Sequence, residues 1–201
     1  IINEPTAAAL YYGFKDGGSF SGKYVVYDLG GGTFDVSIVE ANGNDIEVLA
    51  TAGVAKLGGD DFDKALRELI QNKYSKLFGE DISEDDLPLS DMASLKVKLS
   101  ERQKSPSLIK GEIVEITREE FEEAIVPLIN QTELLCEDVL DQAGITVGDV
   151  RAVLLAGGST RVPAIKKSIS KVFQKEPIET ENVDEVVALG ATLYAAMKSS
   201  G

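Results

Sequence analysis

The chain has 201 residues, of which 43% are hydrophobic, and its 34 acidic and 20 basic side chains give a net charge of −14. This length and hydrophobic content suffice for a buried core in one domain or two subdomains, and the acidic balance argues against nucleic acid or an anionic membrane surface as a partner. The sequence has no histidine and one cysteine, Cys136. Histidine triads, histidine-bound metals and internal disulfides are therefore excluded, and a reducing, cytoplasmic location is expected.

The N-terminal half predicts a helix, a small sheet and a second helix. The first helix spans 3–12 with Pro5 in its first turn, and Gly13 is expected to end it. A loop over 16–22 follows. Asp60 is placed to cap the second helix, whose apolar residues recur on one face. The strands between the two helices are expected over 24–28, 33–40 and 46–51, with the hairpin signal Asn42-Gly43 before the last of them.

The C-terminal half predicts a longer helix followed by a strand-helix unit. The acidic stretch 80–91 is expected to be an irregular connection. Thr117 and Glu120 are typical of a capping box for one long helix that ends near Gly144. Cys136 lies on the apolar stripe of that helix, which favours a buried structural thiol. The remaining elements are expected as a helix over 94–99, strands over 113–116 and 150–156, a helix over 163–173, and a final helix rich in small residues and capped by Asn182.

Two strand-like runs flank three consecutive glycines in the segment Asp28-Leu29-Gly30-Gly31-Gly32-Thr33-Phe34-Asp35. Glycines adopt backbone angles closed to other residues and let backbone amides come close to a bound group, and a concave row of amides can hold a phosphate. The two aspartates suit a hard cation such as Mg²⁺, which prefers oxygen ligands. The same residues also fit a tight hairpin turn with two capping aspartates.

A second glycine turn lies in Gly157-Gly158-Ser159-Thr160-Arg161, between a predicted strand and a predicted helix. Free amides at a helix N-terminus attract anions, and the planar guanidinium of Arg161 can pair with a phosphate or stack on an aromatic ring. An ordinary strand-to-helix turn has the same pattern. Two such turns in one chain favour a phosphate site over two unrelated turns.

Both glycine turns resemble motifs of the DnaK, or heat-shock protein 70, chaperone family. Three further segments resemble motifs of that family, and all five follow the family's order along the chain. The three segments are Ile1-Ile2-Asn3-Glu4-Pro5-Thr6-Ala7-Ala8-Ala9, Leu57-Gly58-Gly59-Asp60-Asp61-Phe62-Asp63 and Asn182-Val183-Asp184-Glu185-Val186-Val187-Ala188-Leu189-Gly190-Ala191.

The resemblance corresponds to the second lobe of the family's ATPase domain. It implies an α/β fold of the actin-like ATPase type, with a ribonuclease H-like βββαβα core, a mixed sheet with helices, and an inserted smaller α+β subdomain. We expect the core at 1–57 and 126–201 and the insertion at 58–125. The first ATPase lobe, which carries the family's first phosphate loop and catalytic lysine, and the peptide-binding domain are expected as other parts of the full-length protein.

The resemblance also assigns residues to ATP or ADP and Mg²⁺. Asp28, Thr33 and Glu4 would be catalytic, and Asp28 and Asp35 would hold Mg²⁺ partly through water. Glu4 equally fits a first-turn residue that complements the helix dipole. The β- and γ-phosphates would lie on Gly30, Gly31, Gly32 and Thr33.

On the nucleoside side, the resemblance assigns Lys96 and Ser100, which lie one helical turn apart, to the ribose and adenine. The opposite side would consist of Gly157, Gly158, Ser159 and Arg161, with Asp184 as a further candidate that also fits a helix cap.

The chain departs from the family at Ala93, where many relatives carry a glutamate that accepts from the ribose hydroxyls. Losing one such hydrogen bond costs about 0.5–1.5 kcal/mol, or roughly a factor of two to ten in affinity. Val97 stands where some relatives have arginine, which leaves Arg161 to stack on the base. The sequence therefore predicts either weaker nucleotide binding than is typical of the family, or a local alignment with the family that is shifted by about one residue.

The function implied is that of an ATP-dependent chaperone, in which a nucleotide exchange factor and a J-domain co-chaperone are the expected partners. The lobe alone would bind nucleotide weakly and turn it over hardly at all. Two alternatives stay open. One is a regulatory module that docks exchange factors or co-chaperones, and the other is a different member of the actin and sugar-kinase superfamily.

Overall fold

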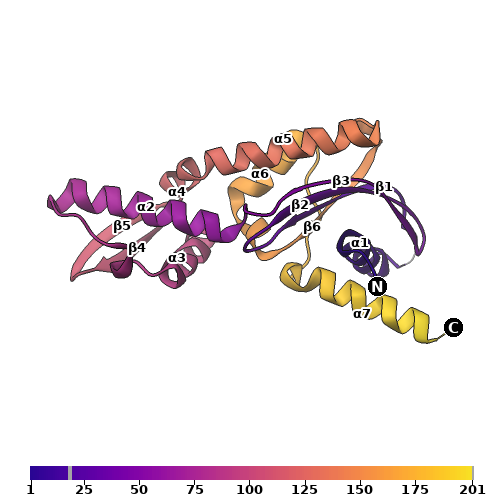
Figure 1. The fold of residues 1–201 in the computed structure, drawn as a ribbon, viewed down its shortest axis with the longest axis horizontal. Helices are drawn as coiled ribbons and strands as arrows, with labels where there is room; N and C mark the ends of the chain where they lie inside the picture. Colours follow the sequence, from indigo (N-terminus) through magenta and orange to yellow (C-terminus); the bar gives the residue numbers. More distant parts are fainter. Residues whose placement is uncertain (18–19, 201) are drawn as a thin grey trace.

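The computed structural model describes residues 1–17 and 20–200. Its central feature is a four-stranded mixed sheet in the order β3-β2-β1-β6 (Figure 1). β1 pairs antiparallel with β2, which pairs antiparallel with β3, and β6 runs parallel to β1. The strands are β1 (Ser21–Leu29), β2 (Phe34–Asn42), β3 (Asp45–Val54) and β6 (Val150–Ala156).

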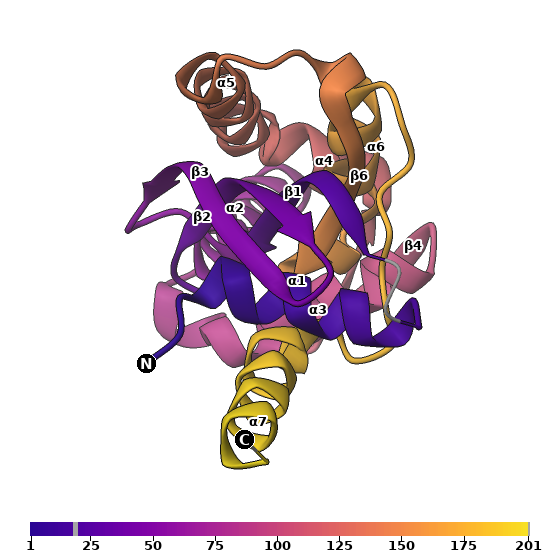
Figure 2. The ribbon, with the colours of Figure 1, turned by 90° about the vertical axis from the view of Figure 1, so that its right-hand side faces the viewer.

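Helices cover both faces of this sheet (Figures 1 and 2). Alternate residues of β1 point to opposite faces, so that Val25 and Tyr27 join one hydrophobic cluster while Tyr24 and Val26 join the other. α5 (Val126–Ala143) and α6 (Pro163–Phe173) pack on the first face, and α1 (Glu4–Lys15) and α7 (Val186–Ser199) on the second. The order βββαβα around a mixed sheet confirms the predicted α/β fold.

Between β3 and α5 the chain forms a second, smaller α+β unit, at the left of Figure 1. It contains α2 (Gly59–Phe78), a 3₁₀ turn η1 (Glu84–Asp86), α3 (Leu89–Glu101), the antiparallel hairpin β4 (Lys104–Ile109) and β5 (Glu112–Thr117), and α4 (Arg118–Ala124). Its buried residues continue the cluster on the α5 face of the main sheet. The division into a core and an insertion at 58–125 remains a prediction.

The first helix is longer than predicted, because Gly13 does not end it. α1 continues to Lys15, and Gly13 is buried within it. A Cβ at Gly13 would lie 3.1 Å from the Phe20 ring, so this glycine serves close packing. β1 begins at Ser21, within the loop expected over 16–22, and the rest of that prediction falls partly on residues 18 and 19, which lie outside the described residues.

The caps of two helices also differ from the prediction. α2 begins at Gly59, and the carboxylate of Asp61, not Asp60, accepts a hydrogen bond from the Gly58 amide at 3.0 Å. The last helix is preceded by a 3₁₀ turn, η4 (Val183–Glu185). The Asn182 side chain caps neither and donates instead to the Tyr11 hydroxyl at 3.4 Å.

The long helix expected after Thr117 is broken into two. The predicted capping box is present, with the Glu120 amide donating to Thr117 Oγ1 at 3.1 Å, but α4 ends at Ala124 and α5 starts at Val126. Pro127 has no N–H to continue the helical ladder, which explains the break. α3, in contrast, extends well beyond the predicted range 94–99 and takes in the end of the acidic stretch.

In the C-terminal half, packing explains the small residues of the last helix and confirms the buried thiol. A Cβ at Gly190 would overlap the Ala7 carbonyl, so the small residues of α7 do allow it to lie directly on α1. Cys136 is 2% exposed, and burial raises the pKa of its thiol. Within residues 1–17 and 20–200, no helix has the length and hydrophobicity needed to cross a membrane.

Candidate functional site

The first glycine turn joins β1 to β2, and two of its carbonyls accept hydrogen bonds from amides at the start of α2. The Gly30 carbonyl accepts from the Gly59 amide at 2.9 Å and the Gly31 carbonyl from the Asp60 amide at 2.8 Å. Within the described residues, the amides of Gly31, Gly32 and Thr33 donate no hydrogen bond, and all three residues are exposed. The turn is therefore fixed in place with several amides available to an anion.

The second glycine turn lies directly against the first. Gly157 has a φ of 88°, and a Cβ there would overlap the Leu29 carbonyl, so only glycine fits. Ser159 Oγ donates to the Gly30 carbonyl at 3.1 Å. Two segments separated by 129 residues in sequence thus form one continuous backbone surface.

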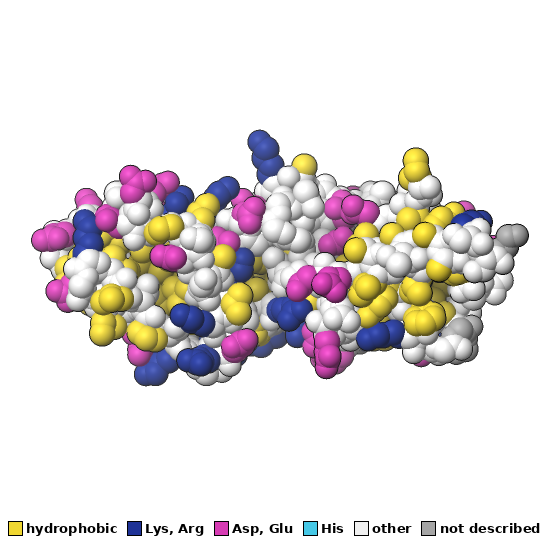
Figure 3. Space-filling view, turned by 90° about the horizontal axis from the view of Figure 1, so that it is seen from below, with side chains coloured by type: hydrophobic (Ala, Val, Ile, Leu, Met, Phe, Trp, Pro, Cys, Tyr) yellow, Lys and Arg dark blue, Asp and Glu magenta, His cyan; other side chains and the backbone are white. Residues whose placement is uncertain are grey.

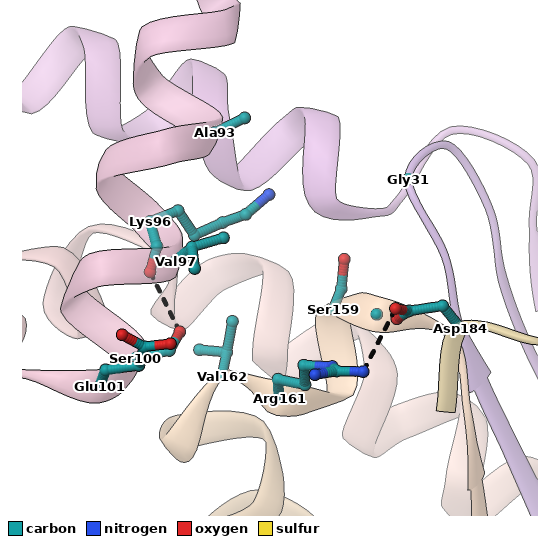
Figure 4. A pocket seen from close by; sticks show the side chains of 11 residues that line it. Gly31, Ala93, Lys96, Val97, Ser100, Glu101, Ser159, Arg161, Val162 and Asp184 are labelled. Carbon is teal, nitrogen blue, oxygen red and sulfur yellow. Dashed lines mark hydrogen bonds and ion pairs between the residues drawn. The ribbon is translucent and has the colours of Figure 1, made fainter. Parts of the chain in front are cut away.

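A cavity of about 590 Å³ opens beside this surface (Figure 4). α3 forms one wall, and the turn before α6 forms the other. The cavity brings together most of the residues predicted for the nucleoside, but Gly157 lies outside it and donates its amide to the Val183 carbonyl at 2.9 Å. The lining residues are Gly31, Ala93, Lys96, Val97, Ser100, Glu101, Gly158, Ser159, Arg161, Val162 and Asp184.

The polar side chains of the cavity are held by neighbours. Arg161 Nη2 donates to the Glu181 carbonyl at 3.0 Å and pairs with Asp184 at 3.2 Å, with both side chains about half exposed. Lys96 Nζ lies 2.7 Å from Asp63 Oδ1 and donates to the Gly59 carbonyl at 3.0 Å. The Ser100 hydroxyl donates to the Lys96 carbonyl at 3.0 Å, which leaves its lone pairs free to accept.

A second cavity, of about 360 Å³, contains the predicted acidic residues Glu4, Asp28 and Asp35. Asp28 and Asp35 are directly opposite each other on β1 and β2, on either side of the glycine turn. Burial, with the nearby charges of Glu4 and Asp35, raises the pKa of Asp28 to about 6. Burial also raises the pKa of Asp35.

These carboxylates fit a hard cation. In the described part of the chain, no group of three acidic or cysteine side chains is close enough to bind a metal on its own. Mg²⁺ usually takes one or two carboxylates and completes its shell with water and phosphate oxygens. A pair of carboxylates beside a row of free amides matches that coordination.

Sequence reasoning missed three residues here. Glu101 and Val162 line the first cavity, and the 4% exposed Asp63 pairs with Lys96. Asp63 had a visible signal, because it lies three residues before Leu66 on the apolar side of its helix, where a buried carboxylate needs a partner. The contribution of Glu101 and Val162 depends on how two distant helices meet.

The match of the chain to known families agrees with this arrangement. The family model described as "Hsp70 protein" matches residues 1–201. The chain belongs to the Hsp70 family. It is 38% identical over 195 residues to the chaperone protein HscA of Yersinia pseudotuberculosis, a match that covers 97% of the chain and 30% of that protein. The fold is thus that of an actin-like ATPase lobe, part of an Hsp70 nucleotide-binding domain, in a family whose members bind ATP or ADP and Mg²⁺.

Proposed function

We propose that this chain is the nucleotide-binding lobe of an ATP-dependent chaperone. Adenosine occupies the cavity between α3 and the turn before α6, and the phosphates lie on the glycine turns. The observation that carries the proposal is the contact between the two turns through Ser159 and Gly30. It sets a row of free amides between a cavity of nucleoside size and a pair of carboxylates.

The phosphates are bound mainly by backbone. The amides of Gly31, Gly32 and Thr33 donate to the β- and γ-phosphates, and those of Gly158 and Ser159 donate from the second turn. Because these donors are fixed by the carbonyl contacts of Gly30 and Gly31, they need little reorganisation when the anion binds. The α3 wall supplies Lys96 and Ser100 to the ribose and base.

The acidic cavity holds the metal and the attacking water. Bound Mg²⁺ would neutralise phosphate charge as hydrolysis proceeds. Asp28 and Asp35 hold the ion partly through water, and Glu4 orients water from the first turn of α1. Thr33 contributes its hydroxyl next to the γ-phosphate. Without the first lobe, which would carry the opposing phosphate loop and lysine, turnover by this lobe is negligible.

Partners are proposed from the exposed surface. Hydrophobic side chains gather over α1 and α7 (Figure 3), among them Phe14 and Met197, which are 69% and 44% exposed. The chain spans 30% of the length of the HscA relative, and the first ATPase lobe is the proposed cover for this face. A nucleotide exchange factor, a J-domain co-chaperone and the peptide-binding domain complete the proposed assembly in the cytoplasm.

Calorimetric titration with ADP and ATP, with and without Mg²⁺, tests the proposal. Wild-type chain binds ADP, and Arg161→Ala binds it about tenfold more weakly, because the guanidinium that stacks on the base is lost. Arg151→Ala is the matched control, since Arg151 is an exposed arginine bonded to the Ser21 carbonyl outside the cavity. Equal binding by all three proteins, or none by the wild type, contradicts the proposal.

One observation favours a second function, a regulatory module with weak or no hydrolysis. Ala93 presents only a methyl group to the cavity where an acceptor for the ribose is expected. Purified first lobe added in trans discriminates the two functions. Appearance of ATPase activity that depends on Asp28 supports the chaperone ATPase, and nucleotide binding without any turnover supports the regulatory module.

A further inference from the structure

Lys96 reaches the nucleoside cavity from α3, but its ammonium group is held by α2. Its Nζ lies 2.7 Å from Asp63 Oδ1 and 3.0 Å from the Gly59 carbonyl oxygen. The Asp63 and Lys96 side chains are only 6% and 13% exposed. Figure 4 shows the Lys96 side chain extended away from Ser100, toward the start of α2.

A lysine ammonium has three N–H donors. One donates to the Gly59 carbonyl, the ammonium group forms an ion pair with Asp63, and in the described part of the chain it has no further partner. Lys96 lines the cavity, so a remaining donor is available to a ligand there. A flexible lysine normally loses much side-chain entropy when it is fixed, and here that loss already occurs on folding.

Asp63 is also connected to the phosphate turn. α2 begins at Gly59, whose amide donates to the Gly30 carbonyl at 2.9 Å, and the next amide donates to the Gly31 carbonyl. Asp63 lies one helical turn farther along the same helix. Its carboxylate therefore links α2, which is hydrogen-bonded to the phosphate turn, to α3, which carries Lys96.

We infer that Asp63 is a positioning residue for nucleotide binding, which orients Lys96 toward the nucleoside and fixes α3 relative to the phosphate turn. It touches no ligand itself. The inference rests on the proposed function, since it assumes that a nucleotide occupies this cavity. Neutralising Asp63 frees Lys96 and weakens binding of ADP through Lys96 alone.

A double-mutant cycle measured by calorimetric titration with Mg²⁺-ADP tests this. Asp63→Asn and Lys96→Met each weaken binding by about tenfold, the size expected for one charge-assisted contact. The double variant binds no more weakly than Lys96→Met, because Asp63 acts only through that lysine. If Asp63→Asn alone does not fold, the double variant still allows a test, since removing both charges of a buried pair is far better tolerated than removing one. A double variant that binds ADP more weakly than Lys96→Met overturns the inference.

Glu120→Gln is the matched control. It removes the ion pair between Glu120 of α4 and Lys73 of α2, at 2.8 Å, elsewhere in the smaller unit. It is expected to lower thermal stability without changing ADP affinity. The inference is overturned by additive losses in the cycle, or by an Asp63→Asn variant that melts earlier but binds ADP as the wild type does. In either case, binding of ADP by the wild type still supports the proposed function. Absence of ADP binding by the wild type overturns both.

Discussion

The two halves of the proposed nucleotide site consist of different chemical groups. The phosphate half consists of backbone, with the amides of Gly31 to Thr33 fixed by hydrogen bonds to Gly30 and Gly31. The nucleoside half consists of the side chains of Lys96, Ser100 and Arg161, which come from two separate elements. A site made of backbone depends on glycines, which have no side chain. In a site made of side chains, single groups can be replaced one at a time.

The difference predicts how each half responds to substitution. Where the glycine turns meet other backbone, at Gly58 and Gly157, an added Cβ has no space, so changes there affect folding before they affect binding. Gly32, in contrast, has nothing within 4 Å of its Cβ position. On the α3 wall, Ala93 and Val97 stand where other groups also fit, so changes there affect affinity and leave the fold intact.

Gly157→Ala is expected to have the largest effect. The added methyl group would overlap the Leu29 carbonyl, and the alanine would have to adopt a positive φ. The free energy of unfolding is therefore expected to fall by about 3 kcal/mol or more. Urea denaturation measures this. Gly111→Ala is the control, because Gly111 has a similar φ of 84° with nothing within 4 Å of its Cβ position, and it is expected to cost only about 1 kcal/mol. Equal losses would show that φ alone, and not the contact between the turns, requires glycine.

Asp28→Asn tests the acidic edge of the phosphate half, and we expect it to stabilise the fold while weakening Mg²⁺-dependent binding. The pKa of Asp28 is about 6 in the folded chain and about 3.9 when unfolded, so the folded state binds more protons between these values. Its ionisation therefore lowers stability as pH rises from about 4 to about 6, and the full cost applies above pH 6.

Removing this charge is expected to raise the free energy of unfolding at pH 7 by about 2 kcal/mol, and Tm by roughly 5 °C. The gain should disappear below about pH 4, where wild type and variant are both neutral at this position. Thermal melts from pH 3.5 to 8 measure it. A Tm difference that does not change with pH would mean that packing, not charge, distinguishes the two side chains.

The same contrast explains what could be predicted from the sequence. The glycine turns assigned to the phosphate half could be located because each is contiguous in sequence, and the neighbouring strands have clear apolar patterns. The three strands, the Asn42-Gly43 hairpin and the helix that ends at Gly144 were also identified from local signals. The broken helix at Ile125 was missed although Pro127 was visible, because the capping box and the apolar stripe on either side suggested one continuous helix.

The nucleoside half was predictable only through family resemblance. Lys96, Ser100 and Arg161 carry no local pattern that brings them together, since their proximity depends on how α3 packs against the turn before α6. Asp63 did have a local signal, its place on the apolar side of its helix, but its partner Lys96 lies 33 positions along the chain and could not be identified from that signal. Gly13 shows the converse error, in which a local helix-ending signal was overruled by the packing of Phe20.

Ala93→Glu tests the nucleoside half. A carboxylate at this position would reach into the cavity and accept from the ribose hydroxyls, so ADP affinity is expected to rise by roughly a factor of two to ten. Stability is expected to remain within about 0.5 kcal/mol of the wild type, because the half-buried Ala93 side chain borders an open cavity rather than the core. Calorimetry with ADP measures the gain, and 2′,3′-dideoxy-ADP is the control ligand, which should show none. A loss of affinity for both ligands would mean that added negative charge outweighs the hydrogen bond.

Ser100→Ala is expected to have the smallest effect, a loss of ADP affinity of no more than about threefold. The Ser100 hydroxyl donates its proton to the Lys96 carbonyl, so it can only accept from the base, and the exocyclic amine of adenine is the donor available to it. Inosine diphosphate lacks that amine, so the variant and the wild type should bind it equally well. If Ser100→Ala weakens binding of both nucleotides alike, the hydroxyl contacts a group that they share. Either it accepts from a ribose hydroxyl, or it turns from Lys96 and donates to a ring nitrogen. In the second case the nucleoside half would rearrange on binding, in contrast to the fixed amides of the phosphate half.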